Sequence, residues 1–136
     1  MKLKEAVEIC YGKNQKDVEV EYREIPILGT GGLIGYSSKA LYDKESVLIG
    51  RKGTIGLPFY INKPFWTIDT LFYTKVNTEV VIPKYLYYNL LTIGLERYSE
   101  GAAVPSLTTK TLYEIELKIH NMSIQRHIVN INWRSL

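Results

Sequence analysis

Apolar residues in the first ten positions recur at helical spacing. They are Leu3, Ala6, Val7 and Cys10, and Gly12 follows them. This spacing gathers apolar side chains on one face of a helix, and glycine commonly ends a helix. The pattern therefore predicts a short helix that stops near Gly12. The next segment, residues 13–21, is mostly polar and predicts a loop.

Short apolar segments separated by glycine and proline fill the middle of the chain. The first begins at Ile25–Leu28, and the next are Ser46–Gly50, Leu57–Ile61 and Thr67–Val76. β-branched and aromatic residues bounded by turn-forming residues are typical of strands. We therefore expect several short strands between residues 25 and 76.

Pro83 opens a second helical pattern, in which Leu86, Leu90 and Leu91 recur before Gly94. Proline suits the first turn of a helix, because its missing N–H has no helical partner there, and glycine suits the residue after the last turn. The pattern predicts a helix over residues 83–94.

Four shorter segments follow. Residues 101–107 are mostly apolar and predict a loop. Thr108–Tyr113 predict one or two helical turns. Ile115–Ile119 alternate apolar and charged residues, which predicts a half-exposed strand. A last helix is predicted over Ser123–Trp133. Its apolar stripe is Ile124, Ile128 and Ile131.

The elements predicted along the whole chain are short strands and segregated helices. They favour an α+β fold, a single compact domain of short twisted strands with a few helices.

Composition narrows the class of protein. The chain has 136 residues, 46% of them hydrophobic, which suits one domain with its own core. Cys10 is the only cysteine, which excludes a disulfide framework and a thiolate zinc site and fits a reducing cytoplasm. No apolar run approaches the length that a membrane-spanning helix needs. We expect a soluble cytoplasmic protein that contacts no membrane.

The positive charge is concentrated in the glycine-rich middle. Residues 25–75 carry six Lys or Arg and three Asp or Glu, whereas residues 1–24 have a net charge of −1. The 11 Tyr exceed what a core of this size needs. A local positive excess is a weak indication of a surface that binds anions, and a solvated surface with no partner explains it almost as well.

Catalytic motifs are weak. The run Gly29–Gly35 has Ile34 where a dinucleotide-binding loop needs glycine, and no phosphate-binding loop follows it. Glu116 and Lys118 have the Glu-x-Lys spacing of metal-dependent nucleases, with Asp69 or Glu100 as the possible upstream ligand. The same spacing occurs in any solvated charge pair on a strand, and we favour that interpretation.

Polar side chains that bind phosphates and base edges lie on three glycine-flanked loops. The loops are Tyr36–Lys39, Arg51–Thr54 and Ser106–Lys110. Such residues also decorate ordinary loops, so composition alone leaves DNA binding as one hypothesis among others.

An ordered set of segments resembles a known family. The segments are Gly31–Tyr36, Val47–Gly56, Tyr85–Leu90, Gly101–Thr108 and Leu112–Ile119, followed by Gln125 and Ile128. This order resembles a target recognition domain of the DNA specificity subunit of a type I restriction-modification enzyme. The resemblance covers almost the whole chain. It departs at His120 and Asn121, where the family commonly has prolines, and at Ile124, where it has glutamate.

The resemblance implies a division of the chain and a set of partners. Residues 1–122 would form the recognition domain, and residues 123–136 would begin the spacer helix of the family. Such a module binds double-stranded DNA and is not catalytic. The methyltransferase (modification) subunits and the restriction subunit, which use S-adenosylmethionine, ATP and magnesium, would carry out the chemistry, and this chain would bind no cofactor or metal. A second half-subunit or a homodimer would complete the pair of recognition domains.

We expect a DNA-binding surface made from glycines that allow a close backbone approach, cations for phosphates or guanine, and neutral hydrogen-bonding residues. The residues are Thr30, Gly31, Gly32, Tyr36, Ser37, Lys39, Arg51, Lys52, Thr54, Ser106, Thr109 and Lys110. Two alternatives stay open for single residues: Tyr36 packs beneath its loop, or Arg51 forms an internal salt bridge with Asp43 or Glu45.

Two further functions also remain open. One is a small metal-dependent nuclease that uses Asp69, Glu116 and Lys118. The other is an interaction module that docks methyltransferase subunits without reading DNA.

Overall fold

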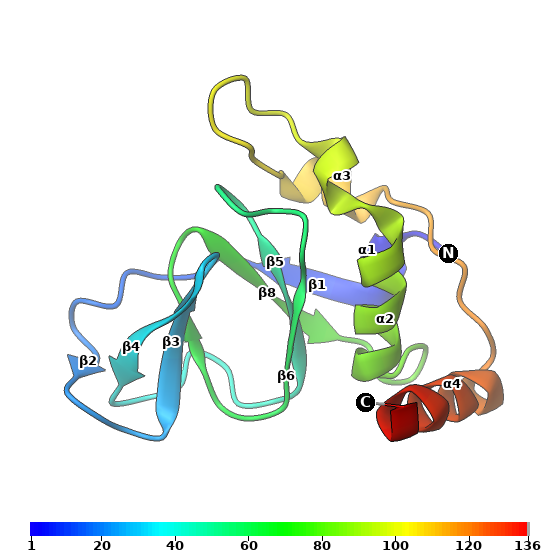
Figure 1. Cartoon of the computed structure of the whole chain (residues 1–136), viewed down its shortest axis with the longest axis horizontal. Coiled ribbons are helices and arrows are strands. Elements are labelled where there is room, and N and C mark those ends of the chain that lie inside the picture. The colour runs from blue at the N-terminus through cyan, green and yellow to red at the C-terminus, as the bar shows by residue number, and fades with distance from the viewer. Residues whose placement is uncertain (136) are drawn as a thin grey trace.

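Two four-stranded β-sheets make up the body of the protein, in a computed structural model that describes the backbone of residues 1–135 and the side chains of residues 1–131 (Figure 1). The first sheet has the order β1-β8-β5-β6 and is antiparallel throughout. Its strands are β1 (Val7–Cys10), β8 (Leu71–Val76), β5 (Ser46–Gly50) and β6 (Phe59–Ile61). The second sheet has the order β2-β4-β3-β7, with β7 parallel to β3. Its strands are β2 (Glu19–Val20), β4 (Gly32–Ser37), β3 (Ile25–Gly29) and β7 (Trp66–Thr67).

The helices share one core with the first sheet. They are α1 (Leu3–Ala6), α2 (Pro83–Ile93), the short 3₁₀ helix η1 (Leu95–Tyr98), α3 (Thr109–Tyr113) and α4 (Met122–Ser135). The main core lies between this sheet and the helices, where Ile49 and Phe72 meet Leu86, Leu90 and Leu112. The expected α+β class is confirmed. No helix within the described residues is long and apolar enough to cross a membrane.

Strand β5 is buried on both faces, which explains its continuous apolar run. Val47 and Ile49 join the core under the helices, whereas Leu48 packs on the other face with Phe65 and Leu71. Successive side chains of a strand point to opposite faces, so a strand between two packed layers needs apolar residues at every position.

The first predicted helix is wrong beyond Ala6. The Glu5 carboxylate accepts a hydrogen bond from the Lys2 amide at 2.7 Å and caps one helical turn, after which Val7–Cys10 pairs with β8. Val7 and Ile9 are buried and Glu8 is exposed, the alternation of a strand. Pairing with β8 therefore outweighs the local helical spacing.

The glycine-rich middle is more regular than its sequence suggests. Gly29–Gly35 belongs to the hairpin of β3 and β4, and the polar segment 13–21 contains β2. The single strand expected over Thr67–Val76 is two strands, because a turn at residues 68–70 separates β7 in the second sheet from β8 in the first. β5 is confirmed, and β6 begins at Phe59 rather than Leu57.

The second half follows the sequence pattern more closely. α2 begins at Pro83 and ends before Gly94, whose φ of 75° is left-handed. The Thr108 hydroxyl caps α3 by accepting a hydrogen bond from the Thr111 amide. The strand expected at Ile115–Ile119 is wrong: the burial alternates as predicted, but this segment makes a single bridge, from Glu116 to Lys2.

The predicted apolar stripe of the last helix is wrong. Gln125 is 1% exposed, whereas Ile124 is 41% and Ile131 50% exposed. Ile128, with its neighbour Val129, does pack against the main core. The helix is turned so that Gln125 can hydrogen-bond to buried backbone groups. Leu136, the last residue of the expected 123–136 segment, lies outside the described residues.

Candidate nucleic-acid interface

Four loops from different parts of the chain meet at one end of the two sheets, at the top of Figure 1. They are residues 29–32 between β3 and β4, residues 51–54 after β5, residues 68–70 between β7 and β8, and residues 101–106 before α3. We call this surface the loop face. Three of its loops come from strand ends of the two sheets, so the sheets fix where the loops lie.

Backbone hydrogen bonds join the loops. The amides of Arg51 and Lys52 both donate to the Thr70 carbonyl, at 2.8 and 3.3 Å. On the other side, the Gly53 amide donates to the Pro105 carbonyl at 3.0 Å and the Leu107 amide donates to the Arg51 carbonyl at 2.9 Å. These bonds use main-chain groups of residues 51–54, which we call the central loop, and the Lys52 and Thr54 side chains of this loop are exposed.

Small residues let the first loop pack against the central one. Thr30 lies beside Gly50 and Gly53, and a Cβ atom built at Gly50 would come within 2.4 Å of the Thr54 carbonyl oxygen. Gly53 has a φ of 88°, a conformation that other residues adopt only with strain. The glycines around Arg51 and Lys52 therefore serve the shape of the central loop.

Arg51 is half-buried and partly engaged within the protein. Its Nη1 donates to the Asp69 carbonyl oxygen at 3.1 Å, and its guanidinium carbon lies 5.2 Å from the centre of the Tyr11 ring. Among the described residues no ion pair joins Arg51 to Asp43 or Glu45, so that alternative is wrong. A guanidinium has several N–H donors, and these contacts hold its plane at the edge of the loop face.

The loop face contains some of the residues predicted from the sequence. They are Thr30, Gly31, Gly32, Arg51, Lys52, Thr54 and Ser106. Lys52 and Thr54 are exposed, and Ser106 bridges to Lys52. With Asp69 as its one acidic side chain against Arg51 and Lys52, the face is weakly positive.

The other predicted residues lie elsewhere. Ser37 is fully buried at the far end of β4, where its hydroxyl donates to the Lys39 carbonyl at 2.5 Å. Tyr36 is half-buried and packs against Tyr22, with ring centres 4.9 Å apart. Thr109 begins α3 and Lys110 follows it. Lys110 lines grooves with Glu100 and Glu114, so its charge faces carboxylates.

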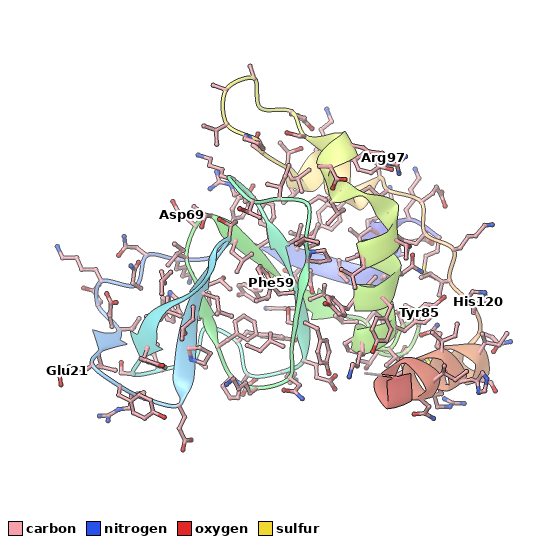
Figure 2. All side chains as sticks on the ribbon, in the orientation of Figure 1. Glu21, Phe59, Asp69, Tyr85, Arg97 and His120 are labelled. Atoms are coloured by element: carbon pink, nitrogen blue, oxygen red, sulfur yellow. The ribbon has the colours of Figure 1, made fainter. Side chains whose placement is uncertain are left out.

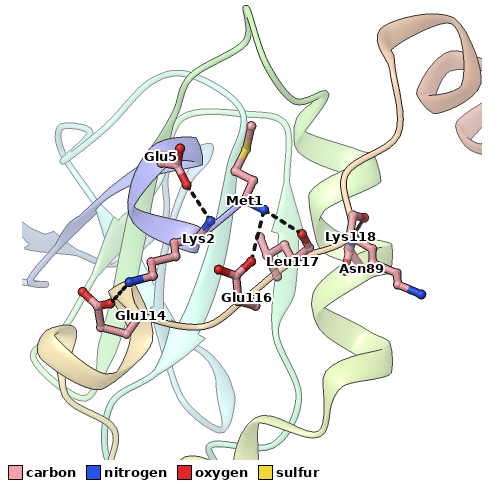
Figure 3. Close-up of polar contacts among 8 residues, drawn as sticks. All are labelled: Met1, Lys2, Glu5, Asn89, Glu114, Glu116, Leu117 and Lys118. Atoms are coloured by element: carbon pink, nitrogen blue, oxygen red, sulfur yellow. Dashed lines mark hydrogen bonds and ion pairs between the residues drawn. The ribbon is translucent and has the colours of Figure 1, made fainter.

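The residues of the nuclease alternative are dispersed. Asp69 is on the loop face, whereas Glu116 lies beside α1, where the amino group of Met1 pairs with its carboxylate at 3.2 Å (Figure 3). The Lys118 side chain points away from Glu116 in the same view. Within the described residues no three His, Cys, Asp or Glu side chains are grouped to hold a metal ion. This arrangement does not favour a metal-dependent nuclease.

The histidines also lie away from the loop face. In Figure 2, Asp69 and His120 are on opposite sides of the molecule. His120 is exposed beside α2, where its Nδ1 and the Tyr85 hydroxyl are 2.7 Å apart. The residue that the sequence reasoning missed at the interface is Tyr11, because nothing in its local pattern indicates a contact with Arg51.

Comparisons with known proteins agree with this architecture. A family model described as the type I restriction modification DNA specificity domain matches residues 1–131. The S subunit of a type I restriction-modification system from M. genitalium is 17% identical over 96% of this chain, with a TM-score of 0.83. The HsdS subunit from Thermoanaerobacter tengcongensis is 16% identical over 98% of it, with a TM-score of 0.76. No curated protein matches the sequence.

A third solved structure, described as the basis of complex assembly and conformational transition of the type I R-M system, is 16% identical over 98% of this chain, with a TM-score of 0.78. The chain spans only 36 to 37% of the length of these three proteins. The structural likeness shows a shared fold, and the family model covers nearly all of the sequence. The chain therefore belongs to the family of type I restriction modification DNA specificity domains.

Proposed function

We propose that this chain is the target recognition domain of a type I restriction-modification specificity subunit and that it reads duplex DNA through the loop face. The observation that carries the proposal is the construction of that face. Main-chain hydrogen bonds from Arg51, Lys52 and Gly53 fix the loops. The Lys52 and Thr54 side chains beside these bonds are exposed, and the Arg51 guanidinium has N–H donors beyond the one bonded to Asp69, so a fixed loop presents groups suited to base edges.

The side chains of the loop face would make different kinds of contact with DNA. Arg51 presents a planar fork that can bind guanine bidentately, and Lys52 is a flexible point charge suited to phosphate. Thr30, Thr54 and Ser106 supply neutral hydrogen bonds to bases or backbone. Lys39 and Lys110 would contact DNA only if the duplex extended beyond the loop face.

The proposal includes partners, because the chain spans about a third of its solved relatives. Residues 1–122 would read DNA, and residues 123–136, which include most of α4, would begin the spacer helix. A second half-subunit or a second copy would supply the other recognition domain. Modification and restriction subunits would carry out methylation and cleavage, and this chain would take no part in catalysis.

Salt-dependent duplex binding tests the proposal. Each phosphate contact contributes about −0.9 to the slope of log K against log salt, so Lys52 alone predicts a slope of about −0.9, and Lys52 together with a phosphate contact from Arg51 predicts about −1.8. Contacts from Lys39 and Lys110 as well would steepen it to about −3.6. Affinity for a pool of random duplexes, measured between about 50 and 200 mM salt, gives the slope.

A negative result would be informative. If the chain binds no duplex at low salt but is retained by co-expressed modification subunits, the interaction module is the correct function. Binding to both would support the full proposal.

A further inference from the structure

The outermost loop of the loop face is apolar. Ala102, Ala103, Val104 and Pro105 are all exposed, and Val104 is 57% exposed. The loop, yellow in Figure 1, projects beyond the neighbouring strands. Charged and hydrogen-bonding side chains are missing from this run, although they are what a DNA-facing loop ordinarily uses. We call residues 101–105 the apolar loop.

The base of the apolar loop is fixed on three sides. The Glu100 amide donates to the Ser106 carbonyl at 2.9 Å and closes the loop on itself. The Gly53 amide donates to the Pro105 carbonyl and attaches the loop to the central loop beside Lys52. The Glu100 carboxylate accepts hydrogen bonds from the hydroxyls of Thr108 and Thr111 and attaches it to α3.

The loop also closes tightly on itself. A Cβ atom at Gly101 would lie 1.7 Å from the Val104 carbonyl oxygen, so only glycine allows this approach. The apolar side chains are therefore presented from a fixed support, next to the cations of the loop face. This is the arrangement of a reading element rather than of a loose surface segment.

The chemistry of these side chains selects their ligand. Methyl groups cannot bind phosphate or recognise a donor or acceptor on a base edge. The apolar feature of a base edge is the C5-methyl group of thymine in the major groove, which small apolar side chains such as Ala contact. Side chains that unstack bases from the minor groove are Phe, Leu, Ile, Met and Pro. Of these the loop has only Pro105, which lies at its base, where its carbonyl accepts a hydrogen bond from the Gly53 amide.

We propose that Ala102, Ala103 and Val104 recognise thymine by contact with its C5-methyl group in the major groove. This inference rests on the proposed function, because it requires that the loop face contacts duplex DNA. It adds to the proposed function the base that the apolar loop prefers. Within one target site, Arg51 would then contact guanine, and the apolar loop would contact thymine.

The test removes the methyl group from the DNA. The chain first selects duplexes from a random pool, and each thymine of the selected site is then replaced in turn by uracil, which lacks only that group. Burial of one methyl group is worth about a fourfold change in affinity, so we expect about fourfold weaker binding at one or two positions.

A variant of the loop separates this effect from changes in the DNA itself. The triple variant A102S/A103S/V104S keeps the side chains small but replaces every methyl group of residues 102–104 with a hydroxyl-bearing side chain. It should bind thymine and uracil duplexes equally while its salt slope stays that of the wild-type chain. Leu91→Thr, an exposed apolar position on α2 (40% exposed), is the matched control and should keep the preference for thymine.

The outcomes are distinct. Equal binding of thymine and uracil duplexes by the wild-type chain, with salt-dependent binding retained, would overturn thymine recognition and leave the proposed function standing. A thymine preference that persists in the triple variant would overturn the role of the apolar loop. Absence of duplex binding under all conditions would overturn the proposed function and this inference together.

Discussion

The loop face and the junction of α2 with α4 are built in opposite ways. At the loop face, main-chain groups of residues 51–53 bond to other main-chain groups, and the Lys52 and Thr54 side chains remain exposed. At the helix junction, the side chain of Gln125 is buried, and it is this side chain that bonds to the main chain. The first arrangement tolerates changes of side chain, and the second does not.

The hydrogen bonds of Gln125 show that the helix junction depends on this one side chain. Its Oε1 accepts from the Ile82 amide at 2.8 Å, and its Nε2 donates to the carbonyls of Val80 at 3.0 Å and His120 at 2.8 Å. One side chain thus joins the start of α2, the segment before it and the approach to α4. The position of α4 against α2 depends on this residue, whereas the exposed side chains of the loop face can vary without refolding.

The largest expected effect follows from removing Gln125. Gln125→Ala leaves the Ile82 amide and the carbonyls of Val80 and His120 without their partner in a buried site. Each unsatisfied group costs about 1–3 kcal/mol, reduced where water enters, so we expect a loss of about 2–4 kcal/mol in the free energy of unfolding. Urea denaturation measures it.

The neighbouring position supplies the control. Ile124→Ala, on the exposed side of α4, should change the free energy of unfolding by less than about 0.5 kcal/mol. If Gln125→Ala proved as stable as Ile124→Ala, the contrast between the two regions would be lost.

The same contrast explains what the sequence could predict. α2 follows from Pro83 and Gly94, and β5 from its apolar run, because local signals fix both. Val7–Cys10 has the spacing of a helix and becomes a strand because β8 pairs with it, a contact more than sixty residues away. The burial of Gln125 is equally non-local, since its partners at residues 80 and 82 are far away in the sequence.

The candidate site was predictable in part for the same reason. Gly50, Gly53 and the charges between them mark the central loop in the sequence alone. The meeting of that loop with Thr30, Thr70 and Pro105 depends on the two sheets, which no local pattern reveals. Tyr36, Ser37 and Lys39 have suitable chemistry, but the length of β4 carries them to the other end of the hairpin.

Arg51→Ala should have the next largest effect. It tests the contrast between the loop face and the helix junction, because the Arg51 side chain lies at the loop face but also makes contacts within the protein. Loss of a base contact should weaken binding to the selected site by about 1–3 kcal/mol and relax specificity at one position. Loss of the bond to the Asp69 carbonyl and of the contact with Tyr11 should lower the free energy of unfolding by about 1 kcal/mol.

Competition binding and thermal denaturation together measure both consequences of the Arg51 change. Unchanged DNA affinity with lowered stability would mean that Arg51 has only its internal role.

Lys52→Ala tests an exposed side chain of the loop face. Lys52 is exposed, and its bridge to Ser106 is made by the main chain, so stability should change by less than about 0.5 kcal/mol. Binding should weaken equally for selected and random duplexes, and the salt slope should flatten by about one unit. A sequence-dependent loss would instead assign base reading to Lys52.

The smallest expected effect concerns Glu100, whose carboxylate attaches the apolar loop to α3. Hydrogen bonds from Thr111 and Thr108 lower the pKa of Glu100 below its ordinary value of 4.5. A carboxylate with a lowered folded-state pKa contributes stability above its unfolded-state pKa, and that contribution is lost as the pH falls through the folded-state value. Wild type should therefore be slightly more stable than Glu100→Gln at pH 7, and the difference should disappear below the folded-state pKa.

Carboxyl-carbon NMR follows the titration of Glu100 directly, and Thr111→Val should return the pKa of Glu100 toward 4.5. A Glu100 signal that titrates at the ordinary value in the wild-type chain would mean that the hydroxyls do not hold this carboxylate, and that the apolar loop depends on its main-chain bonds alone.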